Sequence, residues 1–364
     1  MFDISGVGFC IFFGENLIER GFSIMKKRPT LKTIAEIAGV SHVTISQALR
    51  DFPVISKATT KRIKEIAKEV GYTPNLAARN LALRKPTSIG IIVPTLDHTD
   101  DYSNMIHLIS QTAALKGLSL LLGSCNHNVE LEKSYCKMMC ENRVGALIIA
   151  PCTNDISHIK EICGNIVPTI FLGGKITANE DYIVSYDYEY SGKLAVDHFH
   201  TLGYDDIGFF VCEPNDPTVQ RKIAGYRNSM KDFGLNPKIY QNTQINDAYH
   251  AGFLLTEELL AANQMPKAIW CVNDLMALGS MEVLHRQHVA IPAAVAIMGH
   301  DNLFFDTTPS LSLTSILLPP QKIVTAIMKM IDNLLLGLEE TDYKKSALLT
   351  NIQGELIPRK STLG

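Results

Sequence analysis

The spacing of hydrophobic positions changes along the chain and predicts two kinds of structure. Between residues 30 and 70 the apolar side chains recur at helical intervals, with breaks at 39–41 and 52–53. A further helical pattern covers 75–83, and it ends before Pro86 because proline disfavours helix at the preceding residue. From residue 88 onward, short apolar runs alternate with longer amphipathic stretches. These runs are 89–93, 118–123, 146–150, 169–172, 207–211, 268–272 and 295–299.

Near-continuous apolar strands separated by helices are typical of a parallel sheet that is covered on both faces. The number of strand–helix units favours two such sheets, and a chain of 364 residues is long enough for more than one domain. We therefore predict an α/β fold in which an all-α head precedes two lobes, each built on a parallel sheet. The absence of long hydrophobic runs favours a soluble, cytoplasmic protein with no membrane partner.

The charge is unevenly distributed and points to a polyanionic partner for the head alone. Residues 26–86 contain thirteen lysines and arginines against four acidic residues, whereas residues 87–364 contain twenty against thirty. The whole chain carries a formal charge of only -3. A compact basic segment beside an acidic remainder is typical of proteins that bind nucleic acid through one small part.

The first 24 residues do not read as part of the folded protein. Residues 2–18 are apolar, but Asp3 and Glu15 interrupt them and no basic segment precedes them, which argues against a signal peptide. We expect translation to begin at Met25, so that 1–24 are a mis-assigned leader. An intact-mass measurement of the native protein tests this expectation.

The eight cysteines predict a reduced, cytoplasmic setting rather than a disulfide framework. None lies in a Cys-x-x-Cys pair, and no secretion signal accompanies them. Cys136 and Cys140 are four residues apart on a predicted helix, which suits two metal ligands, but no histidine or carboxylate array completes a site. We therefore expect apolar packing for these thiols, and we predict neither a metal nor a cofactor.

Residues 31–49 have the spacing of a helix-turn-helix. One apolar face runs through both helices, and Gly39 supplies the turn between them. The apolar positions are Ile34, Ala35, Ala38, Val40, Ile45 and Ala48. In such a unit the second helix enters the major groove of DNA. The alternative is an ordinary helical hairpin with a solvated face.

The polar side of this pattern supplies candidate DNA contacts. Ser41 is placed to cap the second helix, which leaves its next residues facing outward. The candidates for base contact are His42, Val43, Ser46 and Gln47, since glutamine and serine can bond base edges and valine can contact a thymine methyl. The candidates for phosphate contact are Thr30, Thr44, Lys57, Thr59, Lys61 and Arg62.

Three motifs in this region resemble the head of the lactose/galactose repressor family of bacterial transcription regulators. They are Ile34-Ala35-x-x-Ala38-Gly39-Val40-Ser41-x-x-Thr44-Ile45-Ser46, Ile55-Ser56-x-x-Thr59 and Gly71-Tyr72-x-Pro74-Asn75-x-x-Ala78-x-x-Leu81. The resemblance implies a hinge helix in which Asn75, Ala78 and Leu81 touch DNA, with the leucine wedged into the minor groove. It also implies a symmetric homodimer on an imperfect palindrome of double-stranded DNA. Many members carry arginine at the position of Gln47, so the operator sequence does not carry over.

The resemblance continues more weakly into a sensor that is similar to periplasmic sugar-binding proteins. It rests on 89–94, 144–149, Asn273-Asp274-x-x-Ala277-x-Gly279 and Gly299-His300-Asp301-Asn302. It implies that the chain crosses between lobes three times and that a small-molecule effector binds in the cleft, beyond the carboxyl ends of the strands. The effector-binding residues expected on this basis are Tyr102, Gly173, Lys222, Asn273 and Asp301.

Each of these positions has a simpler interpretation. Asn273 and Asp301 suit helix caps, and Lys222 suits an exposed, solvated helix face. Where some relatives have an acid, this chain has Gly173, and where sugar-binding members often have arginine it has Lys222. The loss of an acid near a retained cation points to an anionic ligand such as a sugar acid. The neighbouring Arg221 is expected to point away from the site.

The predicted organisation follows from these patterns. After the leader, 25–72 form the head, 73–86 the hinge helix and linker, and 87–364 the effector-binding and dimerisation part. We expect the first lobe to comprise 87–186 and 317–345, and the second lobe 187–316 and 346–364. The end of the chain has no leucine heptads, so a dimer is expected rather than a tetramer built on a terminal coiled coil.

The predicted function is a DNA-binding transcription regulator, most simply a repressor, associated with the nucleoid and switched by a metabolite. No phosphate-binding glycine loop, nucleophile elbow or His-Glu-x-x-His motif is present, so we do not predict an enzyme. The alternative is a sugar-binding protein whose basic head docks another protein. Whether the effector releases or recruits the head is left open.

Overall fold

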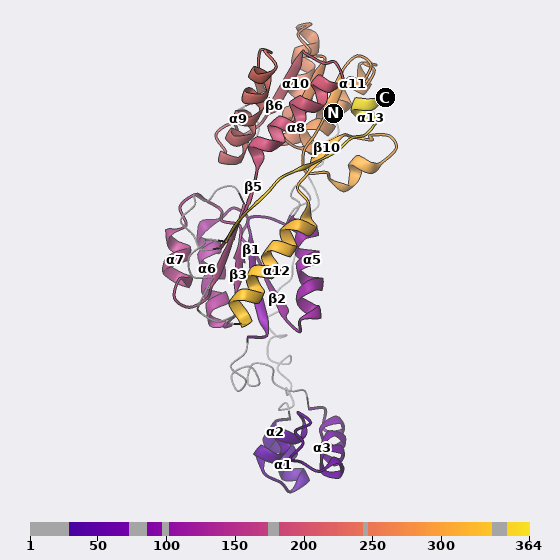
Figure 1. Cartoon of the computed structure of the whole chain (residues 1–364). Helices are drawn as coiled ribbons and strands as arrows, with labels where there is room; N and C mark the ends of the chain where they lie inside the picture. The colour runs from indigo at the N-terminus through magenta and orange to yellow at the C-terminus, as the bar shows by residue number, and fades with distance from the viewer. Residues whose placement is uncertain (1–28, 73–85, 97–101, 174–181, 243–246, 337–347) are drawn as a thin grey trace, which may run out of the picture. The chain divides into compact units, whose positions relative to one another are not determined.

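The computed structural model describes residues 29–72, 86–96, 102–173, 182–242, 247–336 and 348–364 (Figure 1). The chain divides into two compact units, Met1–Arg84 and Lys85–Gly364. The described part of the first unit is a head of three helices, α1 (Leu31–Ala38), α2 (His42–Ala48) and α3 (Lys57–Glu69). The second unit has two lobes.

The head is held together by a small apolar core. Ile34 of α1, Ile45 and Ala48 of α2 and Ile63 of α3 are almost completely buried against one another. Gly39 ends α1 in the left-handed region, at φ 69°, where a residue with a side chain would be strained. The apolar face predicted from the sequence is therefore the face that the three helices share.

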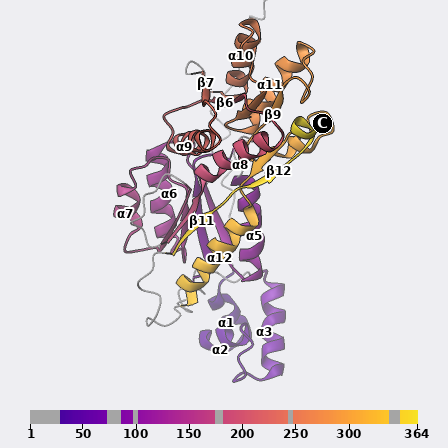
Figure 2. The same cartoon turned by 45° about the horizontal axis from the view of Figure 1, so that its top comes forward.

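The first lobe is built on a six-stranded parallel sheet in the order β11-β5-β4-β3-β1-β2. Its strands are β1 (Ser88–Val93), β2 (Ser119–Ser124), β3 (Leu147–Ile149), β4 (Thr169–Leu172), β5 (Tyr182–Tyr186) and β11 (Leu348–Ile352). Helices α5 (Tyr102–Leu115) and α12 (Pro320–Leu336) pack on one face, and α6 (Val129–Glu141) and α7 (Ser157–Cys163) pack on the other (Figure 2). Burial on both faces explains why these strands read as continuous apolar runs.

The second lobe has a four-stranded parallel sheet in the order β7-β6-β8-β9. Its strands are β6 (Ile207–Val211), β7 (Lys238–Gln241), β8 (Ala268–Cys271) and β9 (Ala296–Met298). Helices α8 (Tyr188–Thr201) and α9 (Pro217–Asp232) pack on each other, as do α10 (Ala248–Ala261) and α11 (Asp274–Arg286). A short antiparallel pair, β10 (Ser315–Leu317) with β12 (Glu355–Ile357), a 3-10 turn at Phe304–Thr307 and α13 (Lys360–Leu363) complete the lobe.

Glycines set how closely the helices of the second lobe approach. A Cβ atom on Gly192 of α8 would lie 2.3 Å from the backbone nitrogen of Tyr226, and one on Gly225 of α9 would lie 2.0 Å from the carbonyl oxygen of Glu189. Neither position can hold a larger residue unless the helices separate. The close crossing brings the first turn of α8 and the second turn of α9 to the candidate ligand site.

The chain passes between the lobes three times, after β5, after β10 and after β11 (Figure 1). The expected division of the chain was wrong in one place, because 346–364 were assigned to the second lobe. Strand β11 instead pairs in parallel with β5, with Thr350 opposite Val184, so it extends the sheet of the first lobe before the last crossing. This strand lies at the edge of its sheet and lacks the continuous apolar run that marked the central strands.

No helix within the described ranges combines the length and the apolar character needed to cross a lipid bilayer.

Candidate functional site

The second helix of the head has a capped start and two unlike faces. The Ser41 hydroxyl accepts a hydrogen bond from the backbone N–H of Thr44 at 3.1 Å, and the two hydroxyl oxygens lie 2.8 Å apart. This bond satisfies one of the unpaired amides at the helix start and fixes where α2 begins. Ile45 and Ala48 are fully buried, whereas the side chain of Val43 is 61% exposed. The helix therefore presents its first residues to solvent and its later apolar residues to the core.

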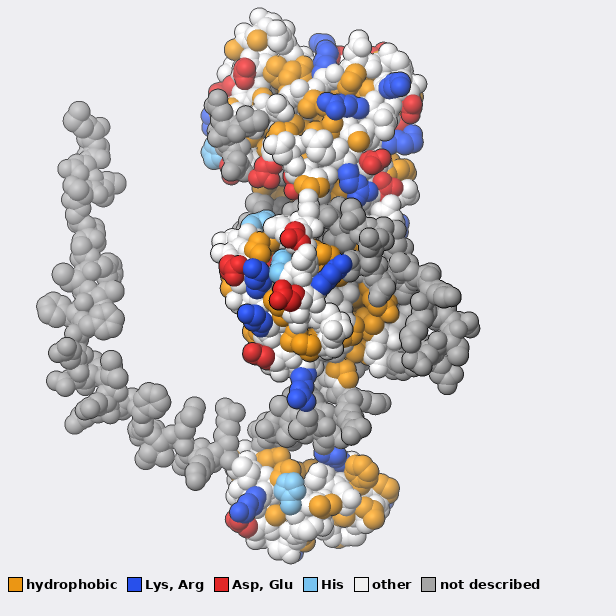
Figure 3. Space-filling model, turned by 90° about the vertical axis from the view of Figure 1, so that its left-hand side faces the viewer, with side chains coloured by type: hydrophobic (Ala, Val, Ile, Leu, Met, Phe, Trp, Pro, Cys, Tyr) orange, Lys and Arg blue, Asp and Glu red, His pale blue; other side chains and the backbone are white. Residues whose placement is uncertain are grey.

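The predicted base-contacting residues differ in exposure. His42 and Val43 are exposed, while Ser46 and Gln47 are half-buried at the side of the helix. Hydrophobic, histidine and basic side chains all reach the surface of the head (Figure 3). Such a surface can contact base edges in DNA, because the exposed Val43 can touch a thymine methyl group while the neighbouring polar side chains form hydrogen bonds.

The predicted phosphate-contacting residues lie at helix starts or on exposed helix faces. Thr30 caps α1 by accepting from the N–H of Thr33 at 3.3 Å, and Ser56 caps α3 by accepting from Thr59 at 3.2 Å. Lys57 lies on the first turn of α3 and is exposed. Helix N-termini with free N–H groups and nearby cations favour anions such as phosphate.

In the second lobe, polar side chains gather where α9 meets the carboxyl ends of the strands. Lys222 is only 6% exposed, and its Nζ donates to the carbonyl oxygen of Val272, directly after β8, at 2.8 Å. The Nζ also lies 5.4 Å from the centre of the Tyr188 ring. Burial lowers the pKa of Lys222, while the carboxylates of Asp301, Asp274 and Asp216 oppose that shift.

Asp301 lies in the loop after β9 and is held by His300. Its Oδ1 lies 2.6 Å from Nδ1 of His300, whose Nε2 lies 3.2 Å from the hydroxyl oxygen of Ser191 in α8. His300 is fully buried, and burial together with Lys222 lowers its pKa. The backbone of Asp301 has φ 105°, which is rare for a residue with a side chain. A strained, anchored carboxylate that stays 24% exposed is typical of a ligand-binding position.

A second carboxylic acid, Asp274, forms hydrogen bonds with the loop that follows β9 and carries Asp301. It is fully buried at the start of α11, where Oδ2 accepts from the N–H of Leu303 at 2.9 Å and Oδ1 accepts from Ser315 at 2.7 Å. Its backbone N–H donates to the carbonyl oxygen of His300 at 2.9 Å. Burial raises the pKa of Asp274 well above its usual range, and the nearby Asp306 adds to the shift. These bonds fix the path of the loop that holds Asp301.

Comparisons with known proteins match both units. Residues 30–75 match the family model of bacterial regulatory proteins of the lacI family, and residues 196–362 match the model of a periplasmic binding protein-like domain. The HTH-type transcriptional regulator AscG of Escherichia coli (strain K12) is 28% identical over 338 residues, which cover 92% of this chain and 98% of AscG. The head of this chain therefore matches the lacI family, and the chain is similar to HTH-type transcription regulators over most of its length. The chain is a helix-turn-helix transcription regulator with a sensor of the periplasmic-binding type.

Two further similarities support the lacI-family assignment. The HTH-type transcriptional repressor PurR of Pasteurella multocida (strain Pm70) is 27% identical over 292 residues, which cover 79% of this chain and 86% of PurR. Among solved structures, the lac repressor dimer bound to operator and the anti-inducer ONPF has a TM-score of 0.80 and 24% identity, and the match covers 93% of this chain and 100% of that chain. That structural similarity confirms the predicted two-lobed fold.

The structure brings three of the five expected effector residues together. Lys222 bonds to the carbonyl of the residue before Asn273, and the Asp301 carboxylate is close enough to affect the pKa of Lys222. Tyr102, at the start of α5, packs with Tyr188 against the core of the first lobe. Gly173 follows β4 at φ 103°, and its N–H donates to the carbonyl of Val184 at 2.9 Å. No contact joins Gly173 to the cluster among the described residues.

The simpler interpretations fare differently at each position. Asn273 does cap a helix, because its Oδ1 accepts from the N–H of Met276 at 2.9 Å. Lys222 is buried rather than solvated, and Asp301 bonds His300 instead of capping a helix. The expectation that Arg221 points away was wrong, since its Cζ lies 5.9 Å from the centre of the same Tyr188 ring. Asn75, Ala78 and Leu81 lie outside the described residues, as does the leader.

Sequence reasoning missed the partners of the site. Tyr188, Ser191 and Asp306 gave no motif signal, and Tyr188 follows a strand that was itself not predicted. His300 lies in the motif at 299–302 but was not expected to hold Asp301.

Sequence reasoning also missed a cluster of cysteine, glutamate and histidine in the first lobe. Of the two thiols that it did consider, Cys136 is buried in an apolar core and Cys140 packs against that core, as expected. Contacts between residues that are far apart in the sequence produce these groups, so no local spacing marks them.

Proposed function

We propose that this lacI-family regulator binds an imperfect palindromic operator as a homodimer and acts as a repressor that a sugar or sugar acid switches. The observation that carries the proposal is the orientation of α2, whose polar first residues and Val43 face solvent while Ile45 and Ala48 hold the helix to the core. A helix presented in this way fits the major groove. The protein then acts in the cytoplasm, where the DNA is.

The head residues divide into two roles. Base reading falls to His42, Val43, Ser46 and Gln47, and the amide of glutamine favours adenine. Positioning on the phosphates falls to the remaining candidates, which are Thr30, Ser41, Thr44, Lys57, Thr59, Lys61 and Arg62. The hydroxyls of Ser41 and Thr44 bond each other, which uses one of their two protons, so one of the two hydroxyls can still donate to a phosphate oxygen.

Hinge residues Asn75, Ala78 and Leu81 complete the DNA contacts in this proposal. A leucine wedged between base pairs unstacks them and bends the duplex. The bent duplex contacts more protein surface, and these contacts offset the free energy lost in unstacking. Two heads related by a symmetry axis then read two half-sites, so the operator is a palindrome. The similarity of the sensor to the lac repressor dimer supports this arrangement.

The effector is proposed to bind at Lys222 and Asp301, with Asn273, Tyr102 and Gly173 completing the site. A buried ammonium donates to ligand oxygens, and the anchored carboxylate accepts from ligand hydroxyls, which together suit a sugar. The effector shifts DNA binding only as far as it prefers one lobe arrangement over the other.

Salt dependence of binding tests the role of the head. Affinity of the full chain for a mixed-sequence duplex should fall steeply with rising salt, because each neutralised phosphate releases counterions. Lys61→Ala should reduce the slope of log affinity against log salt by about one. Lys137→Ala, an exposed lysine of the first lobe, is the matched control and should leave the slope unchanged. A flat salt dependence would favour the alternative of a head that docks another protein.

A thermal-shift screen of the full chain against sugars and sugar acids tests the effector. A compound that binds the folded state alone raises the melting temperature. Each hit is then added to the DNA titration, where it should change the affinity for DNA. A panel in which no sugar or sugar acid moves either quantity would remove this part of the proposal while leaving DNA binding intact.

A further inference from the structure

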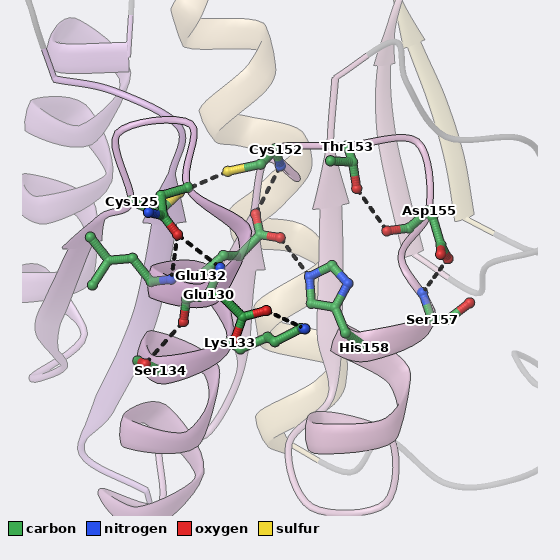
Figure 4. Close-up of polar contacts among 12 residues, drawn as sticks. Cys125, Glu130, Glu132, Lys133, Ser134, Cys152, Thr153, Asp155, Ser157 and His158 are labelled. Atoms are coloured by element: carbon green, nitrogen blue, oxygen red, sulfur yellow. Dashed lines mark hydrogen bonds and ion pairs between the residues drawn. The ribbon is translucent and has the colours of Figure 1, made fainter.

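Four chemically active side chains meet at the carboxyl edge of the first-lobe sheet (Figure 4). Cys125 follows β2 directly, Cys152 lies three residues after β3, Glu132 is in α6, and His158 is in α7. The two Sγ atoms are 3.0 Å apart. Glu132 accepts from the backbone N–H of Cys152 through Oε2 at 2.8 Å and meets Nε2 of His158 through Oε1 at 2.7 Å. Four separate segments of the lobe thus converge on one carboxylate.

The carboxylate of Glu132 is in an environment that calls for a cation. Its side chain is 0% exposed, and its only ion-pair partner among the described residues is His158, which is itself 12% exposed. A buried carboxylate is strongly unfavourable unless positive charge compensates it. Two thiols on the same side add no positive charge. A bound cation would supply it.

The distances suit a small, thiophilic ion. One Sγ from each cysteine and a carboxylate oxygen of Glu132 all lie within 4.8 Å of one another. Zinc binds thiolates at about 2.3 Å and carboxylate oxygens at about 2.0–2.2 Å, so a single ion reaches all three atoms. The sulfur pair must open by somewhat less than about 1 Å, because two ligands of a tetrahedral zinc are roughly 3.8 Å apart. Cys125 and Cys152 both sit in loops that follow strands, which can accommodate that movement.

The same sulfur contact could be read as a disulfide about to form, but the surroundings argue against it. Disulfide exchange proceeds through a thiolate, and a thiolate next to a buried carboxylate is destabilised by repulsion between like charges. Reactive cysteines lie beside lysine, arginine, protonated histidine or a helix N-terminus, whereas the histidine of this cluster meets Glu132 rather than either thiol. A metal ion removes this repulsion by binding all three anionic groups.

We propose that Cys125, Cys152 and Glu132 bind a thiophilic divalent cation, for which Zn²⁺ is the best match. His158 holds the Glu132 carboxylate in place through its ring nitrogen, as a partner outside the ligand set commonly does. Binding releases the two thiol protons to solvent and leaves a fourth coordination position for water. The ion ties the ends of β2 and β3 to α6 and so stabilises the first lobe independently of DNA or effector.

The test uses the full chain, purified with a reductant, stripped with a chelator and titrated with Co²⁺ and then Zn²⁺. We expect one ion per chain, the intense near-ultraviolet absorption of cobalt bound to thiolates, and loss of that absorption when zinc displaces the cobalt. Cys125→Ser and Cys152→Ser should each weaken zinc binding by about 100-fold or more, and His158→Asn by about 10- to 100-fold. Cys140→Ser is the matched control and should bind as the wild type does, because its Sγ contacts Ile162 and Cys163 instead.

The spectrum of the unaltered chain makes the proposal independent of whether the variants fold. Reduced wild-type protein that takes up no cobalt, or that gives the spectrum of oxygen ligands alone, would overturn it. A Cys125–Cys152 disulfide found by mass spectrometry in protein that binds no metal after reduction would also overturn it and would assign the pair a redox role.

Discussion

At the scale of single residues, function depends on charges buried beside one another. Lys222 donates to the Val272 carbonyl and lies over the Tyr188 ring, and Asp301 is anchored by the buried His300. Lys222 is held by Val272, 50 residues away, and His300 by Ser191, 109 residues away, which explains why the sequence marked Lys222 and Asp301 but not the contacts that hold them. Charged groups that are already buried lose little further hydration when a ligand binds. Exchanging one of their present hydrogen bonds for a bond to the ligand therefore costs little additional desolvation free energy.

Replacing the buried lysine should abolish effector binding without affecting the head. Lys222→Met removes the donor but keeps the length of the side chain, so the melting shift produced by the best sugar of the screen should disappear. Affinity for DNA without effector should stay within about twofold, because the head is a separate unit. Lys231→Met, an exposed position on the same helix, is the control and should retain the full shift. An unchanged shift in the Lys222 variant would refute its role.

Asp306 should make the second lobe less stable as pH rises. Neither of its carboxyl oxygens has a hydrogen-bond partner within the described chain, and burial raises the pKa of Asp306 to about 6 from the ordinary 3.8. Because the folded pKa is raised, the unfolded chain loses this proton first. The stability is therefore greatest below about pH 4 and falls until the pH passes about 6.

The Asp306→Asn variant tests this sign. Its free energy of unfolding, relative to wild type, should increase between pH 4 and pH 7 by up to about 3 kcal/mol. Fluorescence of Trp270, the single tryptophan and fully buried in the second lobe, reports the transition. Asp232→Asn, at an exposed position, should give a profile parallel to that of wild type. A constant difference between the Asp306 variant and wild type would contradict the assigned shift.

At the scale of elements, the head helices and most strands were predictable because their apolar residues follow a regular pattern. The seven predicted runs correspond to β1, β2, β3, β4, β6, β8 and β9. Strands β7 and β11 lie at sheet edges, as β2 and β9 do, but polar residues interrupt them, and β10 and β12 are short strands that form a separate pair. Strand β5 lies inside its sheet, yet its serine and tyrosines hide the pattern.

The group of Cys125, Glu132, Cys152 and His158 could not be predicted from the sequence either, because its members are far apart along the chain. Cys125 and Cys152 are 27 residues apart, and Glu132 and His158 are 26 residues apart. Parallel strands bring their carboxyl ends to one edge of the sheet whatever the spacing between them, so the cluster becomes visible only once the strand order is known. The sequence therefore supplied candidates for the head, whose contacts are local, more completely than for either lobe.

The cap of the reading helix should control its local stability. Ser41→Ala removes the acceptor for the Thr44 amide and should cost about 1 kcal/mol, which corresponds to about fivefold faster hydrogen exchange in a peptide that covers α2. Ser56→Ala removes the equivalent bond to Thr59 and should accelerate exchange in α3 by a similar factor while leaving α2 unchanged. Equal acceleration of both helices in both variants would show that the head opens as one unit and that neither cap acts locally.

The α8–α9 crossing should tolerate no side chain at Gly225. A Cβ there would lie 2.0 Å from the Glu189 carbonyl oxygen, so Gly225→Ala must force the helices apart and should destabilise the second lobe by roughly 2–4 kcal/mol. Denaturant unfolding followed by Trp270 fluorescence measures the change. Asn228→Ala, an exposed position on α9, should shift the midpoint little. A Gly225 variant as stable as wild type would show that the crossing is not tightly packed.

At the scale of the whole molecule, a small DNA-binding head precedes a larger sensor in the sequence. Residues 73–85, between them, lie outside the described part of the chain. The similarity to AscG over 92% of this chain supports the interpretation of these parts as one regulator. An effector acts on such a protein by binding one arrangement of the two lobes better than another. The proposed metal site stabilises the first lobe and does not depend on the coupling between effector binding and DNA binding. The central claim is thus the reading of a specific duplex by α2.

Selection from a random-sequence duplex library with the purified full chain tests this claim most directly. The account predicts enrichment of one imperfect palindrome, whose half-sites lose their preference at one base pair in Gln47→Ala while the rest of the site is kept. Recovery of sequences with no shared site, bound as tightly as the starting library, would contradict it.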